Sequence, residues 1–164
     1  MISKIAKTVQ RLEVFFGTLF ISIFFITIII QVFCRYLGIT VSWTGEVSLY
    51  SFTWAVFLGA GAMTYEDKHF AFTSLLDRLP GNKKEIANIV IYLIVMSFTL
   101  AILYFGIIIT KKFWNYRWID LPVMKMGYTW LCVPILGGTT TLYCINHIIG
   151  YVKKITQNNA KVEV

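Results

Sequence analysis

Few residues of this chain could bind a cofactor. His69 and His147 are its two histidines. Both follow or end an apolar stretch, so they would lie toward the same end of a helical membrane domain. Two imidazoles in that position could hold a haem. A membrane anchor or electron-transfer subunit that binds haem through His69 and His147 is therefore one alternative, and visible absorption of the purified protein would test it. A single histidine near a helix end is more commonly an interface residue.

The three cysteines, Cys34, Cys132 and Cys144, have no paired spacing. A disulfide or metal site needs a closer constellation, whereas a thiol inside an apolar helix behaves as a small apolar residue. The sequence also contains no nucleophile–base set and no phosphate-binding loop. We therefore expect no enzyme activity, and no catalytic, metal or cofactor-binding residue.

Four long apolar stretches would have to position any functional group. They cover about residues 14–33, 47–65, 86–109 and 128–149. Each has about 20 residues, the length that a helix needs to cross a hydrocarbon core. Backbone groups in that core must be paired within the segment, which requires helices. The sequence thus predicts an all-α membrane protein with four transmembrane helices.

The charge composition supports this class. Only 14% of the 164 residues are charged, compared with about a quarter in soluble domains, so no soluble catalytic domain would fit beside the helices. The net charge of +7 has a simple cause in a membrane protein, because basic residues at helix ends set topology and meet anionic lipids. We expect membrane lipids, and not nucleic acid, as partners.

Basic residues predict the orientation. About two thirds of the 15 Lys and Arg residues fall in the two termini and the middle loop. The positive-inside rule then places both termini in the cytoplasm. Short amphipathic helices at the interface are expected over about residues 2–12, as an alternative to a frayed tail, and over about 70–79. The four-helix domain would span residues 1–152, and the polar residues 153–164 would form a disordered tail.

Polar residues at the helix ends offer few chemical roles. Arg35 and Glu46 flank a short loop, so an ion pair between them is expected, with contact to a second membrane subunit as the other possibility. Ala55 and Gly59 have the spacing of small residues that lets helices approach closely. The interiors of the four stretches lack the acids and paired helix breaks of an ion or substrate path. A channel or holin would need polar faces, and only short patches such as 139–141 are present. These features favour an accessory or scaffold protein.

Several motifs, in their order along the chain, resemble the small membrane subunit of TRAP (tripartite ATP-independent periplasmic) transporters, the DctQ type. They are Arg35-Tyr36, Trp43-x-x-Glu46, Trp54 with Leu58-Gly59-Ala60, His69 before Leu79-Pro80, Leu121-Pro122, and Tyr128 with Val133-Pro134-Ile135. The resemblance extends to about Tyr151 and includes the length, the four spans and the cytoplasmic termini.

The resemblance implies a bacterial inner-membrane complex with two partners. A periplasmic binding protein would capture an organic acid, either sialic acid or a C4-dicarboxylate. A large multi-span subunit would carry it by sodium symport, and the substrate and sodium sites would belong to that subunit. The candidates for structural or partner contacts in this chain are Arg35, Trp43, Glu46, Trp54, Gly59, Glu66 and His69.

The basic and aromatic loop after the third stretch suggests a second contact. Positive charge is disfavoured on the outer side of the membrane, so its presence there could suit an acidic patch on a periplasmic protein. Interfacial anchoring by the same residue types is the alternative. The docking candidates are Lys111, Lys112, Trp114, Arg117 and Trp118.

Overall fold

The computed structural model describes residues 2–66 and 82–162. It consists of helices, with α1 over Ile2–Tyr36, α2 over Trp43–Tyr65, α4 over Asn82–Phe113, α5 over Met126–Trp130 and α6 over Cys132–Val162. Four helices in this part of the chain are long and apolar enough to cross a membrane, the last of them running from α5 into α6. The prediction of an all-α protein with four transmembrane helices is confirmed.

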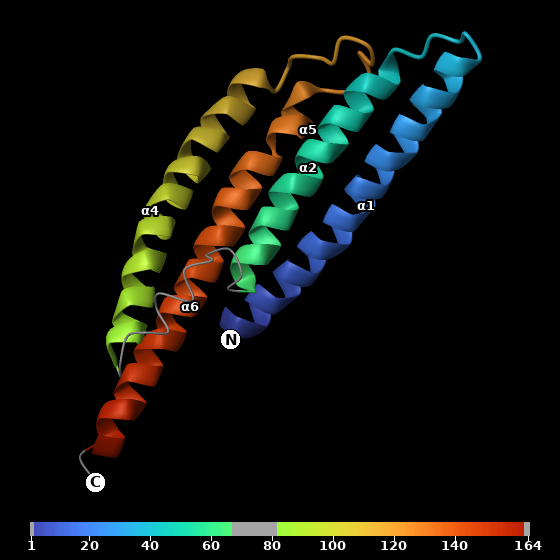
Figure 1. Cartoon of the computed structure of the whole chain (residues 1–164). Coiled ribbons are helices and arrows are strands. Elements are labelled where there is room, and N and C mark those ends of the chain that lie inside the picture. Colours follow the sequence, from blue (N-terminus) through green and yellow to red (C-terminus); the bar gives the residue numbers. More distant parts are fainter. Residues whose placement is uncertain (1, 67–81, 163–164) are drawn as a thin grey trace.

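The long helices lie side by side in the order α4, α6, α2, α1 (Figure 1). α1 packs along α2, α2 along α6, and α6 along α4, while α1 and α4 make no contact with each other within the described residues. The start of α1 and the end of α6 lie at the same end of the molecule. The two flanking helices are much less buried than the two central ones, so most of their apolar side chains face outward.

The helices extend beyond the apolar stretches. Residues 2–12 form the first turns of α1 without a break, and not a separate element. No proline or glycine interrupts them, and the acid that follows them, Glu13, has a partner inside the fold. The tail expected to be disordered is instead helical as far as Val162, because nothing between Tyr151 and Val162 breaks a helix. The helix expected over 70–79 lies outside the described residues.

Two local features set the helix ends that matter for the site. α1 ends at Tyr36, and Gly38 follows with φ +71°, the left-handed conformation that favours glycine after a helix. At the junction of α5 and α6, Pro134 has no N–H to donate to the carbonyl of Trp130. Thr110 of α4 compensates, because its Oγ1 lies 3.1 Å from that oxygen. The carbonyl left without its helix partner between α5 and α6 thus has a hydrogen-bond donor in the neighbouring helix α4.

Candidate partner-binding site

Glu46 holds the outer loop between α4 and α5. This residue lies in the first turn of α2. Its Oε1 accepts a hydrogen bond from the N–H of Ile119 at 2.8 Å, and its Oε2 accepts from Asp120 at 2.9 Å and Leu121 at 3.2 Å. One carboxylate therefore ties three consecutive backbone groups to α2.

The prediction of an ion pair between Arg35 and Glu46 was wrong. Within the described residues no ion pair joins them, and Arg35 is exposed. The physical reason is that three N–H groups of the loop between α4 and α5 already bind the Glu46 carboxylate. The short loop between α1 and α2, from which the ion pair was predicted, carries no sign of this distant contact.

Trp118 anchors the same loop from inside. It is only 7% exposed, its Nε1 donates to Thr129 Oγ1 at 3.1 Å, and its ring centre lies 4.4 Å from that of Tyr50. Met126 N donates to Tyr116 O at 2.8 Å, which closes the base of the loop. Trp118 was expected as a docking residue, but its side chain is not presented to a partner.

The other docking candidates remain on the surface. Lys111 and Lys112 are exposed in the last turn of α4, and Trp114 packs edge-on against Tyr128 while staying partly exposed. The guanidinium of Arg117 donates to Pro122 O at 2.7 Å. The loop is thus a fixed surface with basic groups on its exterior.

Two apolar residues of this loop were not anticipated. Ile119 is 86% exposed and Val123 is 82% exposed. Glu46 binds the N–H of Ile119 and leaves the Ile119 side chain outside. Apolar groups of this kind beside basic ones are typical of protein contacts, but no periodicity in the sequence distinguishes them.

Trp54 and Trp43 occupy different positions on α2. Trp54 donates from Nε1 to Tyr128 O at 3.2 Å and stacks on Phe20 with ring centres 5.3 Å apart. It therefore joins α1, α2 and α5. Trp43 stands at the start of α2 with 37% of its surface exposed. Trp54 has an internal role, whereas Trp43 keeps a free face.

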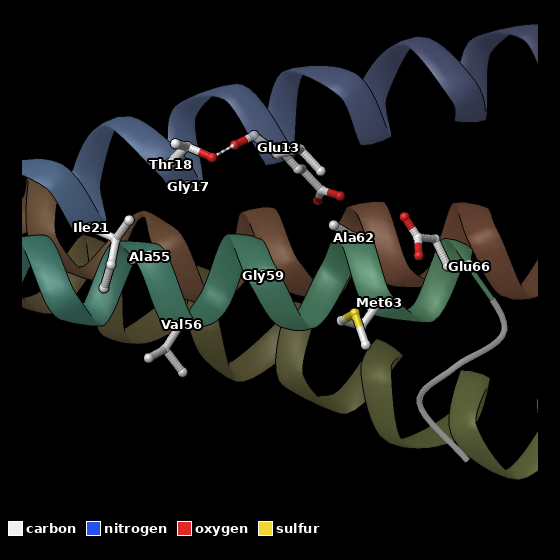
Figure 2. Close-up of a pocket in the computed structure, with 11 residues that line it drawn as sticks. Glu13, Gly17, Thr18, Ile21, Ala55, Val56, Gly59, Ala62, Met63 and Glu66 are labelled. Atoms are coloured by element: carbon white, nitrogen blue, oxygen red, sulfur yellow. Dashed lines mark hydrogen bonds between the residues drawn. The ribbon is translucent and has the colours of Figure 1, made fainter. Parts of the chain in front are cut away.

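A groove runs between α1 and α2, with Gly59 in its wall (Figure 2). Its volume is about 380 Å³. Glu66 ends it, and Gln10 of α1 donates to the Glu66 Oε1 at 3.3 Å. His69 lies outside the described residues. The lining residues are Glu13, Val14, Gly17, Thr18, Ile21, Ala55, Val56, Gly59, Ala62, Met63 and Glu66.

Glu13 is the polar residue that the sequence reasoning missed. It is 4% exposed. Its Oε2 accepts a hydrogen bond from the Tyr143 hydroxyl at 2.6 Å, which links α1 to α6. Its Oε1 has no hydrogen-bond partner among the described residues. The available signal was its position one residue before the first apolar stretch, on the same uninterrupted helix.

His147 serves the packing of three helices. Its Nε2 lies 3.1 Å from the carbonyl oxygen of Tyr65, and its ring stacks on Tyr92 with centres 4.8 Å apart. One of its two ring nitrogens is thus engaged with α2. The three cysteines are free thiols, with Cys132 and Cys144 buried.

The fold and its exposed apolar flanks define a multi-pass membrane protein whose polar groups serve mainly to hold helices and loop together. The chain matches the family model described as "Tripartite ATP-independent periplasmic transporters, DctQ component" over residues 24–154. It belongs to this family, and is a small membrane subunit of a TRAP transporter. A search of curated proteins gave no match to the chain.

Proposed function

We propose that this chain is the non-catalytic subunit that scaffolds the large transport subunit of a sodium-driven TRAP system in a bacterial inner membrane, with both termini in the cytoplasm. Membership of the DctQ family carries the proposal. The polar side chains described above support it, since Glu13, Glu46 and Trp54 each bind a neighbouring element of this chain.

The scaffold role has a direct test. Proteoliposomes would contain the large subunit with or without this chain, together with the binding protein and an imposed sodium gradient. Uptake should fall to background without this chain, although the large subunit still inserts. Full sodium-driven uptake without it would refute the scaffold role.

The same assay addresses the cargo. We propose an organic acid, with sialic acid and a C4-dicarboxylate as the two compounds to try first. Neither is proposed to touch this chain, because the family resemblance assigns the substrate site to the large subunit. Exchange of the binding protein, and not of this subunit, should therefore change which acid is taken up.

The outer loop is proposed to help dock the periplasmic binding protein. Its support is the exposure of Lys111, Lys112 and Arg117, and of Ile119 and Val123, in and beside a loop whose backbone Glu46 holds. A preformed surface loses little conformational entropy on binding. Complementary charge on the partner would speed its arrival and fix its orientation.

Charge reversal tests the docking role with a matched control. Lys111→Glu with Lys112→Glu should lower uptake, most strongly at low salt, because exposed charges are screened at high salt. Lys153→Glu with Lys154→Glu makes the same change in an adjacent lysine pair at the opposite end of the molecule, and should leave salt dependence unchanged. Equal uptake by wild type and the loop variant, with the complex assembled in both, would rule the docking role out.

A further inference from the structure

A cleft separates the start of α1 from the last turns of α6. Ser3 of α1 lines one side, and residues between Asn146 and Lys154 of α6 line the other. Its volume is about 370 Å³. Figure 1 shows that α6 continues past the start of α1 toward the C-terminus. The cleft therefore lies at the end of the molecule that carries both termini.

The cleft lies at the depth of lipid headgroups. His147 lines its deeper part, and the His147 Nε2 is 3.1 Å from the carbonyl oxygen of Tyr65, the last residue of α2. The part of α6 after His147 therefore runs past the end of α2, and it includes the exposed Lys153 and Lys154. Lysine side chains near the ends of membrane helices reach into the headgroup layer.

The charged residues of the cleft are basic. Lys153 and Lys154 line it, and no acidic residue is among the described residues around it. The first turn of α1 carries no acidic residue either. The groove between α1 and α2 is the opposite case, because Glu13 and Glu66 line it without a basic residue. An anion is therefore the occupant that complements the charge of the cleft.

The fold positions polar groups in the cleft without using all of them. The Nζ of Lys154 lies 5.2 Å from the centre of the Tyr151 ring, and that ring packs against Tyr92. The Asn146 amide and the Ser3 hydroxyl line the cleft, and neither has a hydrogen-bond partner among the described residues. These two side chains are available as donors to a ligand.

We propose that this cleft binds the headgroup of an anionic glycerophospholipid, such as phosphatidylglycerol. Lys153 and Lys154 would bind the phosphate, and Asn146, two helical turns deeper, would donate to a glycerol ester carbonyl. The acyl chains would lie along α6 at Ile145 and Ile149, each 38% exposed. Basic clefts between membrane helices are typical sites for anionic headgroups. The site belongs to this chain and does not depend on the proposed scaffold function.

Two other anionic occupants fit the cleft less well. Inorganic phosphate would meet the lysines, but it would make no use of the apolar surface beside them. An acidic segment of a partner protein would match the charge, but the exposed Ile145 and Ile149 suit an acyl chain better. The combination of basic, donor and apolar groups favours an amphiphile.

A photoactivatable phosphatidylglycerol tests the assignment. The full chain, with any subunit that co-purifies, is titrated with this probe in neutral detergent that contains phosphatidylcholine. After irradiation and digestion, mass spectrometry locates the label. Label on residues 146–154 should saturate, and unlabelled phosphatidylglycerol should compete for it. No label there would overturn the proposal.

Two other results of the same titration would also overturn it. Competition by inorganic phosphate as strong as that by phosphatidylglycerol would assign a phosphate site. Label that appears only after the large subunit is removed would assign the cleft to an acidic segment of that subunit.

Neutralisation of the lysines gives the second test. Lys153→Gln with Lys154→Gln should raise the probe concentration for half-maximal labelling about thirtyfold, because each lysine near an anionic headgroup contributes about a factor of five. Lys111→Gln with Lys112→Gln is the matched control, since this exposed adjacent pair lies at the end of α4 outside the cleft. Equal losses in both variants would indicate general charge attraction and refute a specific site.

A substitution that fills the cleft separates shape from charge. Gly150 lines the cleft, and an added Cβ there meets nothing within 4 Å, so Gly150→Leu should fold normally and reduce the label on residues 146–154. Gly45→Leu is the control, because Gly45 is equally open and lies outside the cleft. Unchanged labelling of Gly150→Leu would show that the lipid does not occupy the cleft. Lys153 and Lys154 still serve as the control for docking, because docking is judged by salt dependence at the outer face and not by the absolute rate of uptake.

Discussion

The α4–α6 pair and the α1–α2 pair solve the same packing problem differently. Between α4 and α6, glycine backbones touch the opposite helix: an added Cβ at Gly137 would lie 2.6 Å from Leu103 N, and one at Gly106 would lie 2.9 Å from Pro134 N. Between α1 and α2, Glu13 fills the space at Gly61. An added Cβ at Gly17 would reach only ordinary contact, 3.6 Å from Leu58 Cβ, and one at Gly59 would meet no described atom within 4 Å. The first pair is closed by bare backbone, and the second is held by a buried acid and stays open along a groove.

The difference concerns which groups hold the helices of each pair together. Helix association in a membrane has no hydrophobic driving force of its own, so close van der Waals contact and interhelical hydrogen bonds must supply it. The α4–α6 pair uses its small residues for the fold of this chain. The α1–α2 pair instead relies on Glu13, which fills the space at Gly61 and accepts a hydrogen bond from Tyr143 of α6.

The largest effect is expected at Gly137. Gly137→Ala puts a methyl against the Leu103 backbone, and neither helix backbone can yield locally. The two helices must separate, so the free energy of unfolding should fall by about 3 kcal/mol or more. Unfolding in mixed micelles with increasing dodecyl sulfate, followed by tryptophan fluorescence, would measure it.

Gly138→Ala is the matched control. It makes the same change one residue later, where the nearest atom to an added Cβ, Leu103 Cδ1, lies 4.0 Å away. Its stability should stay close to that of the wild type. Equal stability of the two variants would show that the α4–α6 contact is not closed by backbone, and the comparison between the pairs would collapse.

The second effect concerns the acid that joins α1 to α6. Glu13→Ala removes the acceptor of the Tyr143 hydroxyl and opens a space beside Gly61. An unpaired buried hydroxyl together with a small cavity should cost about 2 kcal/mol. Glu13→Gln keeps an acceptor of nearly the same shape and should lose less. The same micelle titration applies, and full stability of Glu13→Ala would mean that this acid does not hold α1 in place.

A double-mutant cycle sharpens this result. Gly61→Ala alone should destabilise, because the methyl would meet the Glu13 carboxylate. In the Glu13→Ala background the same methyl enters the vacated space and should cost little or even stabilise. The interaction free energy between the two sites should therefore differ clearly from zero, as expected for residues in contact. Additive effects of the two substitutions would mean that the Glu13 side chain does not contact Gly61.

The sequence was sufficient to predict the transmembrane helices but not the contacts that hold them together. Apolar length and the need to pair the backbone in lipid predict four spans, and the structure agrees. The helices run past the apolar stretches because charge does not stop a helix: α1 begins at Ile2 and continues through Glu13 into the first stretch. A helix ends where its backbone is broken, as at Gly38, and not where hydrophobicity ends.

Contacts between distant residues explain the other errors. Glu46 binds Ile119, Asp120 and Leu121, which are more than seventy positions away, whereas sequence reasoning favoured the near neighbour Arg35. Trp118 looked like a surface aromatic within a basic loop, but the loop folds back and buries it. Neither contact produces a periodic pattern in the sequence, because each depends on how the loop between α4 and α5 packs against α2.

The smallest effect is expected at a polar contact of the closed pair. Thr99 of α4 lies 3.1 Å from Thr141 of α6 between their hydroxyl oxygens. Each hydroxyl also has a backbone partner on its own helix, Met96 O for Thr99 and Gly137 O for Thr141. Thr99→Val keeps the shape and leaves Thr141 satisfied, so the loss should be about 0.5 kcal/mol, typical of a hydrogen bond between membrane helices. The Tyr143 hydroxyl has no second hydrogen-bond partner among the described residues, and for that reason the removal of its acceptor Glu13 should cost several times more. If Thr99→Val proved as costly as Glu13→Ala in the same titration, hydrogen bonds and not backbone contact would hold α4 to α6, and the two pairs would no longer differ in kind.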